Sequence, residues 1–324
     1  MRIISVNPKA ALPGGIVQVF LKGLTNTSDV QVSIGEKRAS LIAVSESCIT
    51  IKVPQKPVNG RVEVISSGIE ATGEDITVGR LLATDLHSVA NPAVDTDDRI
   101  YVTDSGNRGE KVPFSVFVVS KDGSKNPFLA EILNPTGLAV GPDECLYITS
   151  RFTGTAYRST LDKRVEKYAD NLGMATGIVF DSKGNLFVGD RGGVIHKVNE
   201  EGHVSVFAKL EPSISAYHFV MSDDDYLYVS APTLSTQDSV YQFDPDGNKK
   251  VFLKGLGRPQ GMAFSPEGKL QVVASYRGRK GVFTYSGGSF EHFISAPMMV
   301  GMAYSKDKSR LFLVDNQSLF VISV

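Results

Sequence analysis

The sequence has little of several features that would define a function by themselves. It contains only two cysteines, Cys48 and Cys145, in different parts of the chain, so neither a disulfide framework nor a cysteine-based zinc site is expected. A net charge of −1 provides no basic excess for binding nucleic acid. No apolar run approaches the roughly 18 residues that a membrane span needs.

Common catalytic and phosphate-binding motifs are missing as well. There is no Gly-x-Ser-x-Gly elbow of a serine hydrolase, and no Walker or Rossmann glycine loop. The first residues hold no apolar core of signal-peptide length, so we expect a soluble chain whose compartment the sequence leaves open. A hydrophobic content of 42% is ample for a core, and 324 residues leave room for two domains.

What the sequence does contain is a repeat of about 40 residues. A pair that begins with Ile or Leu recurs at intervals of 46, 40, 41, 43 and 41 residues, each time after an apolar run and a polar turn. This spacing is typical of stacked β units, and four short antiparallel strands per unit are typical of a propeller blade. The six pairs are Ile100-Tyr101, Leu146-Tyr147, Leu186-Phe187, Leu227-Tyr228, Leu270-Gln271 and Leu311-Phe312.

The unit boundaries predict how such a ring would close. An aromatic mark on the fourth strand precedes the next first-strand glycine by nine positions, as from Phe128 to Gly137. Counting back nine positions from Asn91, the equivalent position in the first unit, gives Leu82. A fourth strand at Leu82 would therefore precede the first unit and have no unit of its own before it in the sequence. We therefore expect residues near 80–86 to pair with the C-terminal unit and leave no free sheet edge.

Residues 1–79 do not share the repeat and predict a separate domain. Short alternating strands, separated by turn residues as in a β-sandwich, are expected at 15–22, 29–34, 37–44, 48–53 and 60–66. In order and spacing, the segments that begin at Ile3, Gly14, Val30, Ile49 and Gly60 resemble the IPT/TIG family of immunoglobulin-like domains. By analogy with propellers that carry such domains, this resemblance implies an extracytoplasmic, bacterial setting.

From residue 80 to 324, the repeated phrases resemble NHL repeats and the gluconolactonase (senescence marker protein) family. The phrases are Pro135–Val140, Thr176–Asp190 and Pro259–Leu270. Together the two resemblances imply an all-β chain, with an immunoglobulin-like β-sandwich over 1–79 and a six-bladed β-propeller over 80–324.

The gluconolactonase resemblance also implies a divalent metal such as Ca²⁺ or Mg²⁺, held by Glu, Asn and Asp oxygens at the channel mouth. The corresponding positions here are Ala90, Tyr217 and Gln260, which supply no carboxylate. We therefore expect no metal of this kind. A metal-dependent hydrolase of lactones or esters with a diverged site remains the alternative.

Two rings of residues are expected to meet on one face of the propeller, because the first strand of each unit begins there and the second strand ends there. The inner ring precedes each first-strand glycine and comprises Ala90, Thr136, Thr176, Tyr217, Gln260 and Val300. The outer ring follows each second strand and includes Asp104, Arg151, Asp190, Arg191, Tyr276, Arg277 and Asp315.

The outer ring predicts an anion site. Arg151, Arg191 and Arg277 offer the bidentate donors that carboxylate and phosphate groups accept. Alternatively, each arginine pairs with a neighbouring aspartate and stiffens the rim. Further hydrogen-bonding groups for a sugar acid or another small polar metabolite are expected from Thr136, Thr176, Tyr217, His218, Gln260 and Tyr276. We therefore predict a binding protein for a small polar or anionic molecule, or for a partner protein.

Two catalytic alternatives stay open at this stage. A ligand set of Asn91 and His218 with Asp104 or Asp190 would give a diverged metal site. His87 or His218 would be the general base of a lyase or isomerase. The sequence does not decide the ligand or the oligomeric state.

Overall fold

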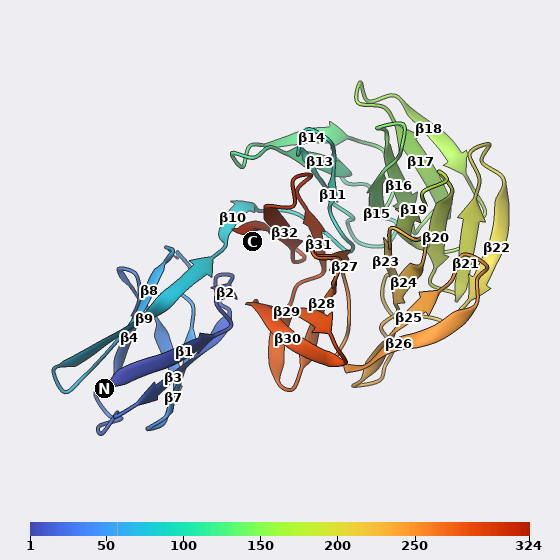
Figure 1. Ribbon diagram of the computed structural model, residues 1–324. Helices are drawn as coiled ribbons and strands as arrows, with labels where there is room; N and C mark the ends of the chain where they lie inside the picture. The colour runs from blue at the N-terminus through green and yellow to red at the C-terminus, as the bar shows by residue number, and fades with distance from the viewer. Residues whose placement is uncertain (57) are drawn as a thin grey trace.

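The computed structural model describes residues 1–56 and 58–324, and the described residues form β-strands without any helix (Figure 1). A small N-terminal unit, blue in Figure 1, lies beside a larger array of sheets coloured from cyan to red. The predicted all-β class is therefore confirmed. No helix that could span a membrane occurs among the residues described.

The N-terminal unit consists of two antiparallel groups of strands around one apolar core. Its first sheet contains β1 (Arg2–Asn7), β3 (Ile16–Lys22), β7 (Cys48–Lys52) and β6 (Ser40–Val44). Its second group contains β5 (Lys37–Arg38), β4 (Gln31–Ile34), β8 (Gly60–Ser66) and β9 (Ile69–Val78). Apolar residues alternate along these strands, so one side of each sheet is buried against the other.

After β10 (Arg80–Ala83), the chain folds into four-stranded antiparallel units in which neighbouring strands follow the order of the sequence. The first two units are β11 (Ala93–Val94), β12 (Ile100–Thr103), β13 (Val116–Val119) and β14 (Lys125–Leu129), then β15 (Pro135–Val140), β16 (Leu146–Ser150), β17 (Thr155–Ser159) and β18 (Val165–Ala169). The next two are β19 (Ala175–Phe180), β20 (Leu186–Asp190), β21 (Val194–Val198) and β22 (Val204–Lys209), then β23 (His218–Met221), β24 (Leu227–Ser230), β25 (Asp238–Phe243) and β26 (Lys249–Leu256).

Two more four-stranded units complete the array, and the last of them combines C-terminal strands with β10. One unit is β27 (Met262–Phe264), β28 (Leu270–Tyr276), β29 (Arg279–Ser286) and β30 (Ser289–Ser295). The final sheet is β31 (Gly301–Tyr304), β32 (Arg310–Val314), β33 (Leu319–Ser323) and β10. Its fourth strand therefore precedes the first unit in sequence, and Arg80 of β10 lies opposite Val321 of β33.

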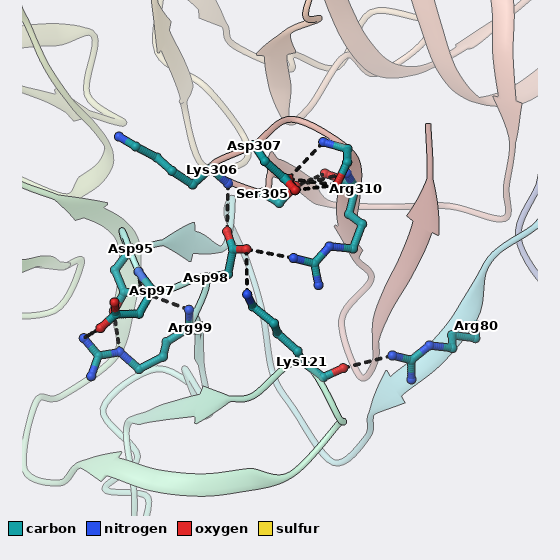
Figure 2. A network of polar contacts seen from close by, with 11 residues as sticks. Arg80, Asp95, Asp97, Asp98, Arg99, Lys121, Ser305, Lys306, Asp307 and Arg310 are labelled. Carbon is teal, nitrogen blue, oxygen red and sulfur yellow. Dashed lines mark hydrogen bonds and ion pairs between the residues drawn. The ribbon is translucent and has the colours of Figure 1, made fainter.

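A polar network joins the first and last units on one face of the array (Figure 2). One carboxylate oxygen of Asp98 accepts hydrogen bonds from Arg310 at 2.7 Å and from the Lys121 ammonium at 3.1 Å. The other oxygen accepts the backbone N–H of Lys306 at 2.8 Å. Burial opposes ionisation of Asp98, but these donors outweigh it and hold the pKa of the carboxyl below its usual value.

Short β2 (Ala10–Ala11) connects the N-terminal unit to the array. It pairs in parallel with β9 on one side and β30 on the other, so one sheet continues from the first unit into the second. Ile16 N donates to Ser295 Oγ, and Ser295 Oγ donates to Ile16 O, both at 2.7 Å. A Cβ atom at Gly15 would lie 2.5 Å from the Ser295 carbonyl oxygen, so this contact requires glycine.

The repeated first-strand glycine has a similar steric reason. A Cβ atom at Gly137 would lie 2.2 Å from the Thr176 carbonyl oxygen, and one at Gly177 would lie 2.6 Å from that of Tyr217. The first strands of neighbouring units therefore approach each other too closely for any side chain at these positions. This close approach explains why most units carry a glycine at this position of the repeat.

Candidate functional site

First strands from every unit surround a common cavity of about 270 Å³, here called the axial cavity. Its wall is made of segments of β11, β15, β19, β23, β27 and β31 together with the residues that precede some of them. Most of the lining side chains are apolar. Asn91 and His218 provide polar side chains, and they stand where the other units carry Gly137, Gly177, Gly261 and Gly301.

A second cavity of about 180 Å³ lies at one end of the axial cavity. We call it the mouth pocket, and it is lined by Val89, Thr136, Arg151, Thr176, Arg191, Ile214, Ser215 and Ala216. In four places, one residue lines the mouth pocket and the next residue in the sequence lines the axial cavity. These pairs are Val89 and Ala90, Thr136 and Gly137, Thr176 and Gly177, and Ala216 and Tyr217. The structure thus brings four predicted site residues, from two inner-ring and two outer-ring positions, to one pocket.

The two arginines of the mouth pocket are held by backbone carbonyl groups. Arg151 Nη2 donates to Gly106 O at 3.1 Å, while Arg191 donates from Nε to Ser213 O at 3.3 Å and from Nη2 to Ile214 O at 2.6 Å. In the described part of the chain, none of the ion pairs includes either arginine. Their positive charges are therefore fixed in place without a carboxylate partner.

The positive charges near Arg151 act on its pKa. Burial lowers the pKa of Arg151, and the positive charges of Arg191 and Arg108 lower it further. Arg108, from the connection between β12 and β13, was not among the residues predicted from the sequence. Asp190 is adjacent to Arg191 in sequence, but its carboxylate instead accepts the backbone N–H groups of Met174 and Gly192, each at 2.8 Å.

The uncharged groups expected to bind a ligand are largely used by the scaffold. Thr136 Oγ1 donates to Asn134 O at 3.2 Å, and Thr176 Oγ1 donates to Gly189 O at 3.0 Å. Both threonines are buried. Gln260 is buried too, and its backbone carbonyl oxygen, not its side-chain amide, accepts a hydrogen bond from Ser230 Oγ at 2.7 Å.

Tyr217 does not present its hydroxyl group to the pore, contrary to expectation. The ring stacks on Phe219 inside the core between two units, and the hydroxyl donates to Glu211 O at 2.6 Å. Burial, followed by the charge of Asp190, raises the pKa of Tyr217 to about 12. Tyr217 therefore contributes to the wall of the axial cavity, but its ring packs between the sheets and its hydroxyl is bonded to the backbone.

His218 is the most isolated polar side chain at the axis. It is 2% exposed, and neither ring nitrogen has a hydrogen-bond partner among the described residues. Burial alone lowers its pKa to about 3, so the imidazole is neutral at physiological pH. Asn91 differs, because its side-chain oxygen accepts the Met302 N–H at 3.2 Å.

The remaining predicted residues lie away from the mouth pocket. Tyr276 packs against Phe283 and Phe290, and the exposed Arg277 guanidinium lies 5.2 Å from the Tyr276 ring centre. This connection faces the N-terminal unit, where Arg279 bonds to Gln18. His87 is half-buried and forms a backbone bridge with Asp104. Neither His87 nor Asp104 lines the axial cavity or the mouth pocket.

The positions that the gluconolactonase resemblance assigns to metal ligands offer few free oxygens for Ca²⁺ or Mg²⁺. Ala90 has no donor atom, the Tyr217 hydroxyl is buried on a carbonyl group, and the oxygen of neighbouring Asn91 already accepts an N–H. Over residues 1–56 and 58–324, no three His, Cys, Asp or Glu side chains are grouped closely enough to hold a metal ion.

Comparison with known proteins supports the fold. The family model for the IPT/TIG domain matches residues 1–78. No curated protein sequence matches the chain. Among solved structures, a Bacteroides thetaiotaomicron protein of unknown function is 15% identical and has a TM-score of 0.61, with 99% of this chain and 97% of that chain covered.

Two further structures carry functional descriptions. A gluconolactonase from Xanthomonas campestris is 17% identical with a TM-score of 0.61, covering 76% of this chain and 89% of that chain. An auxiliary nutrient binding protein from Bacteroides ovatus is 14% identical with a TM-score of 0.52, covering 100% and 98%. At these identities the similarity shows a shared fold: an IPT/TIG domain followed by an all-β array of the kind found in gluconolactonase-like propellers.

Proposed function

We propose that this protein binds a small anionic molecule and that its mouth pocket holds the anionic group. The observation that carries the proposal is the pair Arg151 and Arg191, which come from neighbouring units and lie in one pocket without a carboxylate partner. A bound carboxylate or phosphate would accept bidentate hydrogen bonds from these guanidinium groups and relieve their mutual repulsion.

We further propose that the fold gives this site a rigid scaffold. Residues 80–324 form a six-bladed propeller of the NHL and gluconolactonase-like type, closed by the pairing of β10 with β33. Residues 1–79 form the IPT/TIG domain, which the Ser295 hydrogen bonds and the shared sheet attach to one unit. A closed ring of strands holds the two arginines at a fixed separation, so little conformational entropy is lost when an anion binds.

Similarity to nutrient-binding proteins from Bacteroides supports a binding role and an extracytoplasmic location for this chain. The gluconolactonase similarity would favour hydrolysis, but the corresponding residues lack the metal ligands that such an activity is expected to need. Binding without catalysis, and without a metal cofactor, is therefore the function that we propose.

Calorimetric titration with acetate, hexanoate and inorganic phosphate tests the anion site. We expect Arg151→Gln and Arg191→Gln each to weaken binding of the best of these anions by about 10- to 100-fold, the value of a charged hydrogen bond. Arg158→Gln is the matched control, because Arg158 lies on the opposite face and pairs with Asp143 and Glu166. Unchanged affinity in both mouth variants, or binding that requires added Ca²⁺ or Mg²⁺, would contradict the proposal.

A further inference from the structure

Large apolar side chains are exposed on the connections that carry or contact the mouth arginines. Ile214 lines the mouth pocket and is 45% exposed, and Phe152, which follows Arg151, is 51% exposed. Leu234, in the connection between β24 and β25, is 89% exposed. An exposed apolar side chain in the wall of a charged pocket, as Ile214 is, offers an apolar contact to a ligand bound there.

Hydrogen bonds in neighbouring connections hold these apolar side chains in place. The Ile214 carbonyl oxygen accepts the Arg191 guanidinium, while the Ile214 N–H donates to Pro232 O at 3.1 Å. Ser213 Oγ also donates to Pro232 O, at 2.7 Å. The backbone that carries Ile214 is thus fixed on both sides, by an arginine of the pocket and by the connection that contains Leu234.

Phe152 is positioned by the connection that carries Arg108. A Cβ atom at Gly109 would lie 3.3 Å from Phe152 Cε2, so the ring packs over the backbone next to Arg108. Gly109 N donates to Asn134 Oδ1 at 2.7 Å, which fixes this backbone to the segment before β15. The aromatic ring of the residue after Arg151 therefore lies against the connection that carries Arg108.

The mouth pocket offers few free partners for a hydroxylated ligand. Of the three hydroxyl groups that line it, those of Thr136 and Thr176 donate to backbone carbonyl groups, and both residues are buried, which leaves the hydroxyl group of Ser215. A volume of about 180 Å³ suits an anionic group and a few further atoms. The remainder of a larger ligand would have to lie outside the pocket, over Ile214 and Phe152.

We infer that the ligand is an amphiphilic anion: a carboxylate or phosphate monoester whose body is a hydrocarbon chain or an aromatic ring rather than a polyol. Arg151 and Arg191 bind the anionic group, and Ile214 and Phe152 bind the apolar body. This inference rests on the proposed function and adds the chemical class of the ligand. Ile214 and Phe152 are then the residues that determine specificity.

Titrations with matched six-carbon probes test the inference. Hexanoate and hexyl phosphate carry the anionic group on an apolar chain, gluconate carries a carboxylate on a hydroxylated chain, and hexanol carries the chain alone. We expect hexanoate or hexyl phosphate to bind at least about tenfold more tightly than gluconate, because several methylene groups leave water. The stronger of these two probes identifies the anionic group.

Variants separate this inference from the proposed anion site. Ile214→Ser and Phe152→Ser are expected to weaken hexanoate binding about tenfold more than they weaken acetate binding. Leu161→Ser is the matched control, because Leu161 is 42% exposed in the turn between β17 and β18, on the opposite face. Thermal unfolding of each variant checks that these exposed substitutions leave the fold intact.

The possible failures are distinguishable. Gluconate binding as tightly as hexanoate, or hexanoate affinity unaffected by both serine variants, would overturn the amphiphilic ligand while leaving the anion site standing. Hexanoate and hexanol binding equally well, with no effect of Arg151→Gln, would instead overturn the anion site on which the inference depends.

Discussion

The two faces of the repeat array carry the same kinds of charged side chain and use them differently. On the face opposite the mouth, carboxylates meet cations directly: Asp98 with Arg310 at 2.7 Å, and Asp143 with Arg158 at 2.7 Å. On the mouth face, Arg151 and Arg191 meet carbonyl oxygens only. One face uses charge to join strands and units, whereas the other keeps positive charge unneutralised.

The aspartates of the mouth face explain how this difference arises. Asp190 accepts backbone N–H groups, and Asp238 accepts both the N–H and the hydroxyl of Thr233, at 3.1 and 2.7 Å. These carboxylates stabilise the conformation of their own connections. The guanidinium groups nearby therefore form hydrogen bonds with carbonyl groups and not with these carboxylates. A carbonyl group orients an arginine but does not neutralise it, so the arginine still attracts an external anion.

The largest effect on stability is expected from a substitution at Asp98, whose ion pairs join the first and last units. Asp98→Ala leaves Arg310, Lys121 and the Lys306 N–H without their shared acceptor, so we expect the free energy of unfolding to fall by about 3 kcal/mol. Urea unfolding at pH 7 measures it. Glu166→Ala is the control, because Glu166 is a largely exposed partner of Arg158 and its loss is expected to cost less than about 1 kcal/mol. Equal effects of the two substitutions would contradict a special role for Asp98.

A second effect is expected from His218, which has no charged partner. Its folded pKa lies below its unfolded value, so only the unfolded state gains a proton as the pH falls below about 6.5. We therefore expect this residue alone to lower the free energy of unfolding by about 2 kcal/mol between pH 7 and pH 5. The depressed pKa of Asp98 acts in the same direction, but below this pH window.

His218→Phe tests this pH dependence, since phenylalanine keeps a ring in the same space without a titrating group. Unfolding curves at pH 5, 6 and 7 should show a shallower fall in stability for the variant than for the native chain. His196 and His292 also have pKa values lowered first by burial, and they contribute equally to both proteins. Parallel pH profiles would show that His218 becomes protonated in the folded state.

Much of the fold was predictable because the repeat reflects backbone geometry. The spacing of the glycines placed residues 80–84 outside the first unit, and β10 does pair with β33. The same register predicted that Arg151 and Arg191 share a face, because second strands end where first strands begin. Lining of one pocket by both arginines follows from that rule.

Side-chain direction within the inner ring was less predictable. In a strand, neighbouring residues point to opposite sides, so a single position separates a side chain at the axis from one between sheets. Tyr217 took the inter-sheet direction beside Phe219, while the next residue, His218, took the place of a glycine. Ile214 and Phe152 had no signal in the repeat, because the connections that carry them differ in length from unit to unit.

The smallest effect on stability, and the sharpest contrast with Asp98, is expected at Arg151. Arg151→Gln removes a charge that Arg191 and Arg108 repel, and the glutamine amide can still donate to a carbonyl group. We expect the free energy of unfolding to change by no more than about 0.5 kcal/mol. Any gain should disappear in about 1 M salt, where charges at this distance are screened. Urea unfolding at low and high salt measures both expectations. A loss above about 2 kcal/mol would make Arg151 a structural clamp like Arg310, and the contrast between the two faces would no longer hold.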